Sequence, residues 1–487
     1  MKAGFALGLL SAAALPPLHV IPVLLICVPG LLRLIGTRDG WRGAAKLGFW
    51  FGFGHHLLGL YWITEAILVE AGTFWWLVPI AVPALSAVLA VFIAAPCAVA
   101  RLAPAGLARV LVLAGCWVLA DLARQFVLTG FPWNPWGSVW AIPAWAGDVF
   151  IQPAAWIGVH GLTLATVLTA GLVSLGRRGI VAASVLVLAW GAAGVMRLAQ
   201  PAPAAPGVAL VLVQGNVAQG EKWNQARAVE IFRRYLDLTR GGVARAGAGP
   251  VAVIWPETAS PFLLEADPQA RAAIAQAAGD AVPLVGSVRW DADRKPRNSL
   301  MVLRGNGPPM AIYDKAHLVP FGEYVPGWLP LPVQVVPGVG FGGGPGPRTL
   351  DVPGLPRVGP MICYEAAFPG EVAAADRPAW LVNVTNDAWF GNSTGPRQHL
   401  AAARMRAVEE GLPLARAANT GISAVFDGFG HEVARRGMNE TGVVIAALPG
   451  ALPPTAFGRF GLWIPGLLAL LTLALGATIG LKLHHRG

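Results

Sequence analysis

One cysteine stands where the sequence could place a nucleophile. Cys363 follows the apolar run 357–362, which has the character of a buried strand, and precedes Tyr364 and Glu365. A thiol at a strand end beside a carboxylate has the surroundings of many nucleophilic cysteines. A buried structural cysteine is the alternative interpretation, because a free cysteine commonly packs as a small apolar residue. Cys363 therefore needs a base and a cation from elsewhere in the chain.

Two further ionisable residues follow predicted buried strands. Glu257 lies in the segment IWPETASPF, and Lys315 lies in YDKAHLVPFGEYVP. Each is weak evidence alone, since a glutamate after a strand is usually solvated and a lysine after Tyr-Asp usually covers a hairpin. A thiol is mostly protonated near neutral pH, so a nucleophilic cysteine needs a base and a charge that stabilises the thiolate. A glutamate and a lysine are residue types that meet these two needs.

Alternating strands and helices are expected to position these three residues. Strands are predicted at 207–217, 251–259, 283–290, 357–362, 380–387, 413–417, 422–427 and 441–447, with a hairpin of 298–307 and 309–318. Helices are predicted at 225–246, 268–279 and 396–411, and a Gly/Pro-rich loop at 319–347. This order predicts a sheet covered by helices, an α/β layered domain. The run VAVIWP lacks polar alternation, as strands buried on both faces do.

The composition of the whole chain is that of a membrane protein with a soluble part. Of its 487 residues 55% are hydrophobic and 13% are charged, and the mean hydropathy is +0.57. Soluble domains carry roughly 25% charged residues. The net charge is +10, but residues 201–449 hold 22 basic and 21 acidic residues and are nearly neutral. A basic nucleic-acid-binding domain is therefore not expected.

Eight apolar segments have the length of membrane helices, which need about 20 residues to cross the hydrocarbon core. They are 4–20, 21–34, 47–66, 75–100, 107–127, 151–175, 180–198 and 460–481. Residues 1–20 could instead be a signal peptide. We favour a retained helix, because apolar sequence continues directly through Ile21–Leu34. The expected domains are 1–199 with seven transmembrane helices, 200–455 with the catalytic fold, and 456–487 with the last helix and the tail.

Basic residues orient these segments. With Lys2 in the cytoplasm, eight crossings place the other loop and tail clusters on the same side: Arg38, Arg42 and Lys46; Arg101 and Arg109; Arg177 and Arg178; Lys482 and Arg486. This agrees with the rule that cytoplasmic loops are positively charged. Both termini are thus expected in the cytoplasm, and the domain 200–455 on the opposite side.

Other polar and aromatic residues of the membrane part have simpler interpretations. The connection 128–150 carries Trp133, Trp136, Trp140 and Trp145. These tryptophans are expected to form an interfacial belt, with a hydrophobic wall over a lipid-accessible site as the alternative. The intramembrane residues His55, His56, Asp121 and His160 are expected to make hydrogen bonds between helices. Cys27, Cys97 and Cys116 lie in apolar segments, so Cys363 has no disulfide partner in the soluble segment.

Longer motifs around the three residues carry a family resemblance. They are QGN at 214–216, Trp223 in EKWN, WPE at 255–257, DKAHLVPFGEYVP at 314–326, CYE at 363–365 and NVTNDAWFG at 383–391. The order Glu, Lys, Cys in these contexts resembles the nitrilase superfamily of carbon–nitrogen hydrolases. With the flanking helices, the whole chain resembles the membrane-embedded branch, the apolipoprotein N-acyltransferases. The resemblance implies two parts. One is a multi-pass membrane domain of about eight transmembrane helices, and the other is a nitrilase-like α/β domain, an αββα sandwich.

The resemblance also implies roles for single residues. Glu257 would take the proton of Cys363, and Lys315 would stabilise the oxyanion together with the backbone N–H of Tyr364. Glu323 matches a glutamate that orders the triad, and Tyr364 and Glu365 match residues beside the nucleophile. Two tryptophans, Trp223 and Trp389, match the substrate loop and the NDAWFG motif, with plain packing as the alternative. His317 and His399 could suggest a Cys-His pair, but His317 is better explained as part of the HLVPFGE loop.

The implied reaction moves an acyl chain from a phospholipid, through a cysteine thioester, to the α-amino group of a diacylglyceryl-cysteine of an apolipoprotein. The expected setting is the bacterial inner membrane with the catalytic domain in the periplasm, a monomer, no cofactor and no nucleic-acid partner. One rival is a membrane-anchored amidase that hydrolyses the same acyl-enzyme with water. A scaffold or a transporter is a second rival; a scaffold has no need of intact motifs, and a transporter should show broken helices near the midplane.

Overall fold

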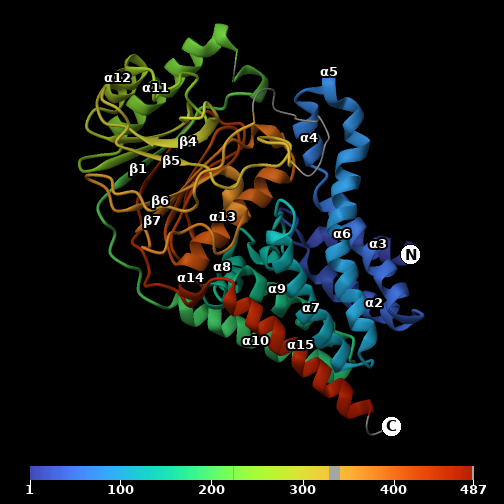
Figure 1. Cartoon of the computed structure of the whole chain (residues 1–487). Helices are drawn as coiled ribbons and strands as arrows, with labels where there is room; N and C mark the ends of the chain where they lie inside the picture. Colours follow the sequence, from blue (N-terminus) through green and yellow to red (C-terminus); the bar gives the residue numbers. More distant parts are fainter. Residues whose placement is uncertain (223, 328–339, 485–487) are drawn as a thin grey trace. The chain divides into compact units, whose positions relative to one another are not determined.

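The computed structural model describes residues 1–222, 224–327 and 340–484, and the chain divides into two compact units. Unit 1 comprises Met1–Thr64, Phe74–Pro201 and Thr455–Gly487, and unit 2 comprises Glu65–Thr73 and Ala202–Pro454. Figure 1 shows both units coloured along the chain. Unit 1 is helical, and unit 2 contains the sheets.

Helices fall in every apolar segment predicted for unit 1. The long ones are α1 (Lys2–Ser11), α2 (Leu24–Gly36), α3 (Gly40–Gly59), α6 (Val78–Leu102), α7 (Leu107–Phe126), α9 (Ala154–Val173), α10 (Arg177–Leu198) and α15 (Trp463–His484). The short helices of unit 1 are α8 (Trp145–Ile151) and α14 (Ala456–Phe460), whereas α4 (Ile63–Leu68) and α5 (Ala71–Phe74) lie mostly in the segment Glu65–Thr73 of unit 2. Aliphatic side chains from α2, α3, α6, α7 and α9 form the core of this unit.

Four helical stretches of the described residues are long and apolar enough to cross a membrane. They are Ala71–Leu102, Ala154–Val173, Arg177–Leu198 and Trp463–Lys482. The helical stretches Lys2–Ala14 and Ile21–Gly36 are shorter. At 1.5 Å per residue they reach about 20 and 24 Å, against roughly 30 Å of hydrocarbon. The prediction of eight crossing helices is therefore supported only for these four.

Small residues bring the helices of unit 1 close together. A Cβ atom on Gly8 of α1 would lie 2.0 Å from the carbonyl oxygen of Phe51 in α3. A Cβ atom on Gly52 would lie 2.9 Å from Cα of Ala90 in α6. Glycine is needed at such contacts because any side chain would separate the backbones.

Polar residues inside unit 1 behave in part as predicted. His55 of α3 bonds to Ser11 of α1 at 2.9 Å and accepts a bond from Trp136 at 3.4 Å, so it links separate segments as expected. Asp121 instead pairs with Arg124 of its own helix at 3.2 Å.

The tryptophans of 128–150 do not form one belt. Trp133 and Trp136 are buried, Trp140 is half-buried, and Trp145 is exposed. Trp136 packs on Trp117 with 4.5 Å between ring centroids. The belt prediction is wrong for Trp133 and Trp136, because neighbouring aromatic and aliphatic side chains enclose them.

Two sheets form the centre of unit 2 within the described residues. The first has the order β11-β1-β2-β3-β4-β5, from Gly442–Ala447, Ala209–Gln214, Val251–Trp255, Val282–Trp290, Pro296–Val302 and Ala311–Asp314. The second has the order β10-β9-β8-β7-β6, from Glu432–Arg436, Ser423–Phe426, Leu414–Ala418, Trp380–Thr385 and Val358–Ile362. Strands β1, β2 and β3 are parallel, as are β6, β7 and β8.

Side chains of the two sheets share one core, which includes Leu212, Ile254, Ile362 and Val384. Helices α11 (Ala228–Arg245) and α12 (Pro268–Ala278) cover the outer face of the first sheet, and α13 (Gly395–Glu410) covers the second (Figure 1). Unit 2 is therefore an αββα sandwich. Strands β2 and β6 are buried along their whole length, as their uninterrupted apolar sequence predicts.

One strand of unit 2 is absent from the sequence prediction. β10 has the sequence EVARR and pairs antiparallel with β9 at the end of the second sheet. Its side chains are mostly exposed or half-buried, so the apolar pattern that marks the other strands is missing. Residues 328–339 of the predicted Gly/Pro-rich loop lie outside the described residues.

Candidate active site

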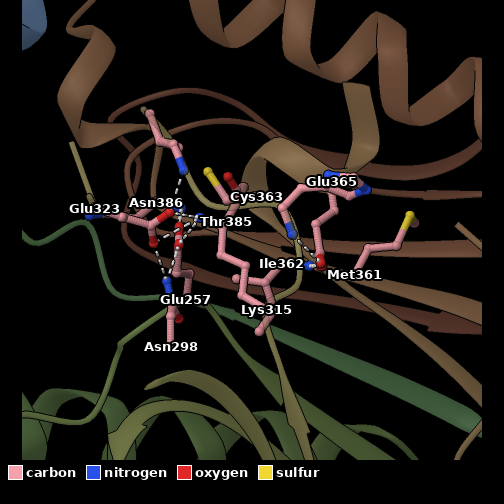
Figure 2. A network of polar contacts seen from close by, with 12 residues as sticks. Glu257, Asn298, Lys315, Glu323, Met361, Ile362, Cys363, Glu365, Thr385 and Asn386 are labelled. Carbon is pink, nitrogen blue, oxygen red and sulfur yellow. Dashed lines mark hydrogen bonds and ion pairs between the residues drawn. The ribbon is translucent and has the colours of Figure 1, made fainter. Parts of the chain in front are cut away.

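Three strand ends bring the predicted triad together. Glu257 follows β2, Lys315 follows β5 and Cys363 follows β6, so each side chain leaves its strand at the same side of the sandwich (Figure 2). All three residues are buried. Cys363 is also the first residue of the short helix η7 (Cys363–Ala367) and has a φ of +52°. A positive φ costs a residue with a Cβ atom roughly 1–2 kcal/mol, so the surrounding contacts must hold this turn.

Lys315 lies between two carboxylates. Its Nζ atom is 3.2 Å from Glu257 Oε1 and 2.9 Å from Glu323 Oε2. Only 1% of the Lys315 side chain is exposed. The backbone N–H of Val319 also donates to Glu323 at 2.8 Å, which fixes the second carboxylate. A buried ammonium is stable in such a place only when charges of opposite sign compensate it.

Two asparagines hold the Glu257 carboxylate. Asn298, in β4, donates through Nδ2 to Glu257 Oε1 at 2.7 Å and to Glu323 Oε1 at 3.0 Å. The backbone N–H of Asn386 donates to Glu257 Oε2 at 2.9 Å. Figure 2 shows these contacts around Glu257. Both oxygens of the carboxylate are thus fixed in direction.

The charges of the cluster keep it ionised. Burial alone would raise the pKa of Glu257, but Lys315 and Lys222 outweigh burial and lower this pKa below its usual value. Burial likewise opposes the charge of Lys315, but Glu257 and Glu323 hold the pKa of the ammonium well above its usual value. At neutral pH Glu257 is therefore a carboxylate that can accept a proton, and Lys315 is a cation.

The Cys363 thiol is protonated in the resting site. Burial raises the pKa of Cys363, and the charge of Glu257 raises it further, while Lys315 acts in the opposite direction. The thiol therefore gives up its proton to a base when it attacks, rather than resting as a thiolate.

The carboxylate of Glu365 links the segment next to Lys315 with the segment next to Cys363 through hydrogen bonds. Its Oε1 atom accepts bonds from Tyr313 Oη at 2.8 Å and from the backbone N–H of Ala316 at 2.7 Å. Its Oε2 atom accepts a bond from the backbone N–H of Ile362 at 2.6 Å. Burial raises the pKa of Glu365, and these backbone bonds oppose the shift. Glu365 thus positions the ends of β5 and β6 and does not point at the sulfur.

A second group of buried polar side chains contacts the backbone of Cys363. His399 of α13 bonds through Nε2 to the carbonyl oxygen of Cys363 at 2.9 Å, and its Nδ1 lies 2.9 Å from Asp387. Arg416 of β8 donates to the other oxygen of Asp387 at 2.7 Å. The imidazole contacts the backbone of Cys363, which helps to hold its positive φ. His317 pairs with Glu371 at 2.7 Å.

The remaining predicted residues are placed as follows. Tyr364 is buried and packs edge-on against Phe368, with 5.0 Å between ring centroids. Trp389 is half-buried in the short helix η8 (Asp387–Phe390). Trp223 lies outside the described residues.

Sequence reasoning missed three residues that contact Glu257: Lys222, Asn298 and Asn386. Lys222 and Asn386 lie in the motifs EKWN and NVTNDAWFG, so these motifs could have indicated both residues. Asn298 lies within β4 and carried no signal. Within residues 1–222, 224–327 and 340–484, no group of three or more His, Cys, Asp or Glu side chains is arranged to hold a metal ion.

Family models match both parts of the chain. The model of the apolipoprotein N-acyltransferase N-terminal domain matches residues 7–172, and that of the carbon-nitrogen hydrolase family matches residues 212–453. The second match agrees with the α/β sandwich of unit 2 and confirms the predicted fold of this domain. Solved structures with some likeness include yeast (Saccharomyces cerevisiae) Nit3, with 18% identity over 50% of this chain and 90% of that one, at a TM-score of 0.38. An amidase from Nesterenkonia sp. has 19% identity over 51% and 93%, at a TM-score of 0.39.

Curated relatives match nearly the whole length. The chain is 41% identical to the apolipoprotein N-acyltransferase of Bradyrhizobium diazoefficiens, over 93% of this chain and 90% of that protein. It is 40% identical to that of Rhodopseudomonas palustris, over 96% and 93%, and 38% identical to that of Brucella suis, over 99% and 96%. These matches confirm the resemblance that the motifs carry. The chain belongs to the apolipoprotein N-acyltransferase family of acyltransferase enzymes.

Proposed function

We propose that this acyltransferase moves a fatty acyl chain from a phospholipid to the α-amino group of the N-terminal S-diacylglyceryl-cysteine of an apolipoprotein, through a thioester on Cys363. The observation that carries the proposal is the buried Lys315 between Glu257 and Glu323, at strand ends that also bear Cys363. Family membership supports the acceptor class, since the relatives are named for N-acyl transfer to apolipoproteins.

The first half-reaction forms the acyl-enzyme. The thiol proton of Cys363 passes to Glu257, and the sulfur attacks the ester carbonyl carbon of the phospholipid. The carbonyl electron pair moves onto oxygen and returns as the bond to the glycerol oxygen breaks. Glu257 then gives its proton to that glycerol oxygen, so lysophospholipid leaves and Cys363 carries the acyl chain as a thioester.

The second half-reaction uses the same groups in the reverse sense. The neutral α-amino group attacks the thioester carbon, and Glu257 takes a proton from the nitrogen. The carbon–sulfur bond breaks, an amide is formed, and the proton returns from Glu257 to the sulfur. One carboxylate therefore serves as base and acid in each step, which suits a group that is ionised at rest but lies in a buried site.

The other residues assist in proposed supporting roles. Lys315 and the backbone N–H of Tyr364 stabilise the oxyanion of each tetrahedral intermediate. Glu323 keeps Lys315 in place, and Glu365 keeps the two chain segments in register. Trp223 and Trp389 are proposed to contact the acyl substrates.

The proposed location is the bacterial inner membrane, with the segment 200–455 in the periplasm and both termini in the cytoplasm. The support is the charge pattern: residues 1–200 hold 11 basic and 5 acidic residues, and residues 450–487 hold 3 basic and none acidic. Eight crossings would place the basic loops on one side, as the positive-inside rule requires.

A two-substrate assay tests the proposal against hydrolysis. The full chain in detergent is supplied with phospholipid carrying a labelled acyl chain and with a diacylated lipopeptide. We expect label in the N-acylated lipopeptide, and none with Cys363→Ser. Free fatty acid as the only labelled product would contradict transfer and would indicate a membrane-anchored amidase.

A further inference from the structure

A second lysine lies in the candidate active site. Lys222 follows the short helix η5 (Gln219–Glu221) and is only 6% exposed. Its Nζ atom donates to the backbone carbonyl oxygen of Glu257 at 2.9 Å. A lysine ammonium has three N–H donors, so this bond leaves two for other acceptors in the site. Lys222 does not follow one of the three strands that carry the triad, and the family resemblance assigns it no role.

The charges of the site call for a second cation. Glu257 and Glu323 both face Lys315, so these three groups sum to one negative charge. Asp387 also raises the pKa of Cys363, but Arg416 pairs with it at 2.7 Å, so these two groups add no net charge. Negative charge on sulfur or on the substrate oxyanion would therefore develop in a buried site that is already negative. Such a charge is unfavourable unless a further positive group lies close by.

Lys222 is that further positive group. Its ammonium is close enough to Glu257 for the charge of that carboxylate to act on it, and close enough to Cys363 to interact with a thiolate there. We infer that Lys222 is a second active-site cation, a positioning residue that holds the Glu257 backbone and lowers the free energy of negative charge at Cys363. The role of Lys222 in acyl transfer rests on the proposed function. Its effect on the ionisation of the Cys363 thiol does not depend on which reaction the enzyme catalyses.

The ionisation of Lys222 gives this role a pH limit. Burial lowers the pKa of Lys222 to about 8, while the charge of Glu257, and that of Cys363 when it is a thiolate, act in the opposite direction. The group is therefore cationic at neutral pH and loses its charge above about pH 8. Lys315, which also faces Glu257, has its pKa well above the usual value and keeps its charge there. A decline of acyl transfer above about pH 8 is thus expected from Lys222.

Alkylation of Cys363 measures the electrostatic effect without any lipid. The full chain in detergent is treated with iodoacetamide at pH 7, and the rate of modification at Cys363 is read by peptide mass. Because each pKa unit changes the thiolate fraction tenfold, we expect Lys222→Met to slow alkylation about tenfold or more. Lys222→Arg should react like the wild type, and so should Lys295→Met, which removes an exposed lysine of unit 2. An unchanged rate in Lys222→Met would overturn the inference.

A pH profile of acyl transfer separates charge from structure. Arginine stays charged at all accessible pH values. Lys222→Arg should therefore keep the neutral-pH rate and lose the decline above about pH 8, even where the methionine variant is poorly folded. A decline that persists in Lys222→Arg would overturn the inference. Absence of acyl transfer in the wild type would refute the proposed function and leave the alkylation comparison intact.

Discussion

Lys315 determines how the residues around it ionise. Two carboxylates share the buried ammonium of Lys315, and Asn298 donates to both of them. Removing one partner of a buried ion pair typically costs about 3–5 kcal/mol, because the other charge is left without compensation. The second carboxylate thus has a purpose: when Glu257 takes a proton and becomes neutral, Glu323 still balances Lys315.

Glu257→Gln tests the proposed base at the level of one atom group. Glutamine keeps the size of the side chain and its contacts with Lys315 but cannot accept the thiol proton. We expect the rate of acyl-adduct formation at Cys363 to fall by about 10²–10⁴-fold, the usual contribution of a general base. Glu230→Gln, on the exposed surface of α11, is the matched control and should leave the rate unchanged. Equal rates in the two variants would contradict the assignment.

Asp387→Asn tests the buried group behind the nucleophile. Burial alone would raise the pKa of Asp387, but Arg416 outweighs it and lowers this pKa from 3.8 to about 2. The folded state thus binds its proton less tightly than the unfolded chain, so the stabilisation is present above about pH 4 and is lost as the pH falls towards about 2. At neutral pH the substitution strands the buried Arg416 charge and should lower the free energy of unfolding by about 3–5 kcal/mol.

Denaturant unfolding of the full chain in detergent at several pH values checks this prediction. The difference between Asp387→Asn and the wild type should shrink between about pH 4 and about pH 2. A difference that stays constant over that range would show that the Asp387 charge does not stabilise the fold.

At the level of elements, the approach of β3 to the end of β2 positions Glu257. A Cβ atom on Gly286 would lie 2.1 Å from the carbonyl oxygen of Pro256 and 2.8 Å from Cα of Glu257. No side chain fits there unless the backbone that carries Glu257 moves. Glycine in this strand therefore sets the position of a side chain on the neighbouring strand.

Gly286→Ala should displace Glu257 and slow acyl-adduct formation by about 10²-fold, the usual effect of a misplacement of about 1 Å. Gly241→Ala is the matched control, because nothing lies within 4 Å of its added Cβ atom in α11. This control should leave the rate unchanged and stabilise the helix slightly. Similar rates for both alanine variants would show that the close approach does not position the base.

The elements of unit 2 were largely predictable because buried strands have uninterrupted apolar sequence. β2 and β6 are examples. β10 was missed since its EVARR sequence pairs through its backbone while its side chains stay largely in solvent. Asn298 could not be found for a different reason: a polar residue in a strand acquires its partners only when separate strands meet. The sequence could therefore name Glu257, Lys315 and Cys363, but not the asparagines that hold them.

At the scale of the whole molecule, the charge and hydropathy of the sequence mark out the same two parts of the chain as the fold does. Most of the net charge of +10 lies outside the nearly neutral segment 201–449, in the part that forms the helical unit. The number of crossings was harder to predict, because apolar composition does not fix helix length. The helical stretch Lys2–Ala14 shows this, since its sequence is apolar but the helix is short.

Labelling of introduced cysteines tests the proposed orientation. In a variant whose four native cysteines are serine, Lys295→Cys lies in unit 2 and Arg178→Cys lies at the start of α10, both exposed. A membrane-impermeant maleimide added to cells with a permeabilised outer membrane should label the first and not the second. Labelling of Arg178→Cys alone would place the charged loops outside and contradict the orientation.

The acyl-enzyme itself is the most direct test of the central claim. The full chain is incubated with phospholipid and no acceptor, its intact mass is measured, and the modified residue is located by peptide mass. We predict a mass increase of one acyl chain on Cys363 that hydroxylamine removes, that a diacylated lipopeptide discharges, and that Cys363→Ser does not show. Turnover of phospholipid and lipopeptide without any adduct on Cys363, or with an adduct on another residue, would contradict the thioester mechanism.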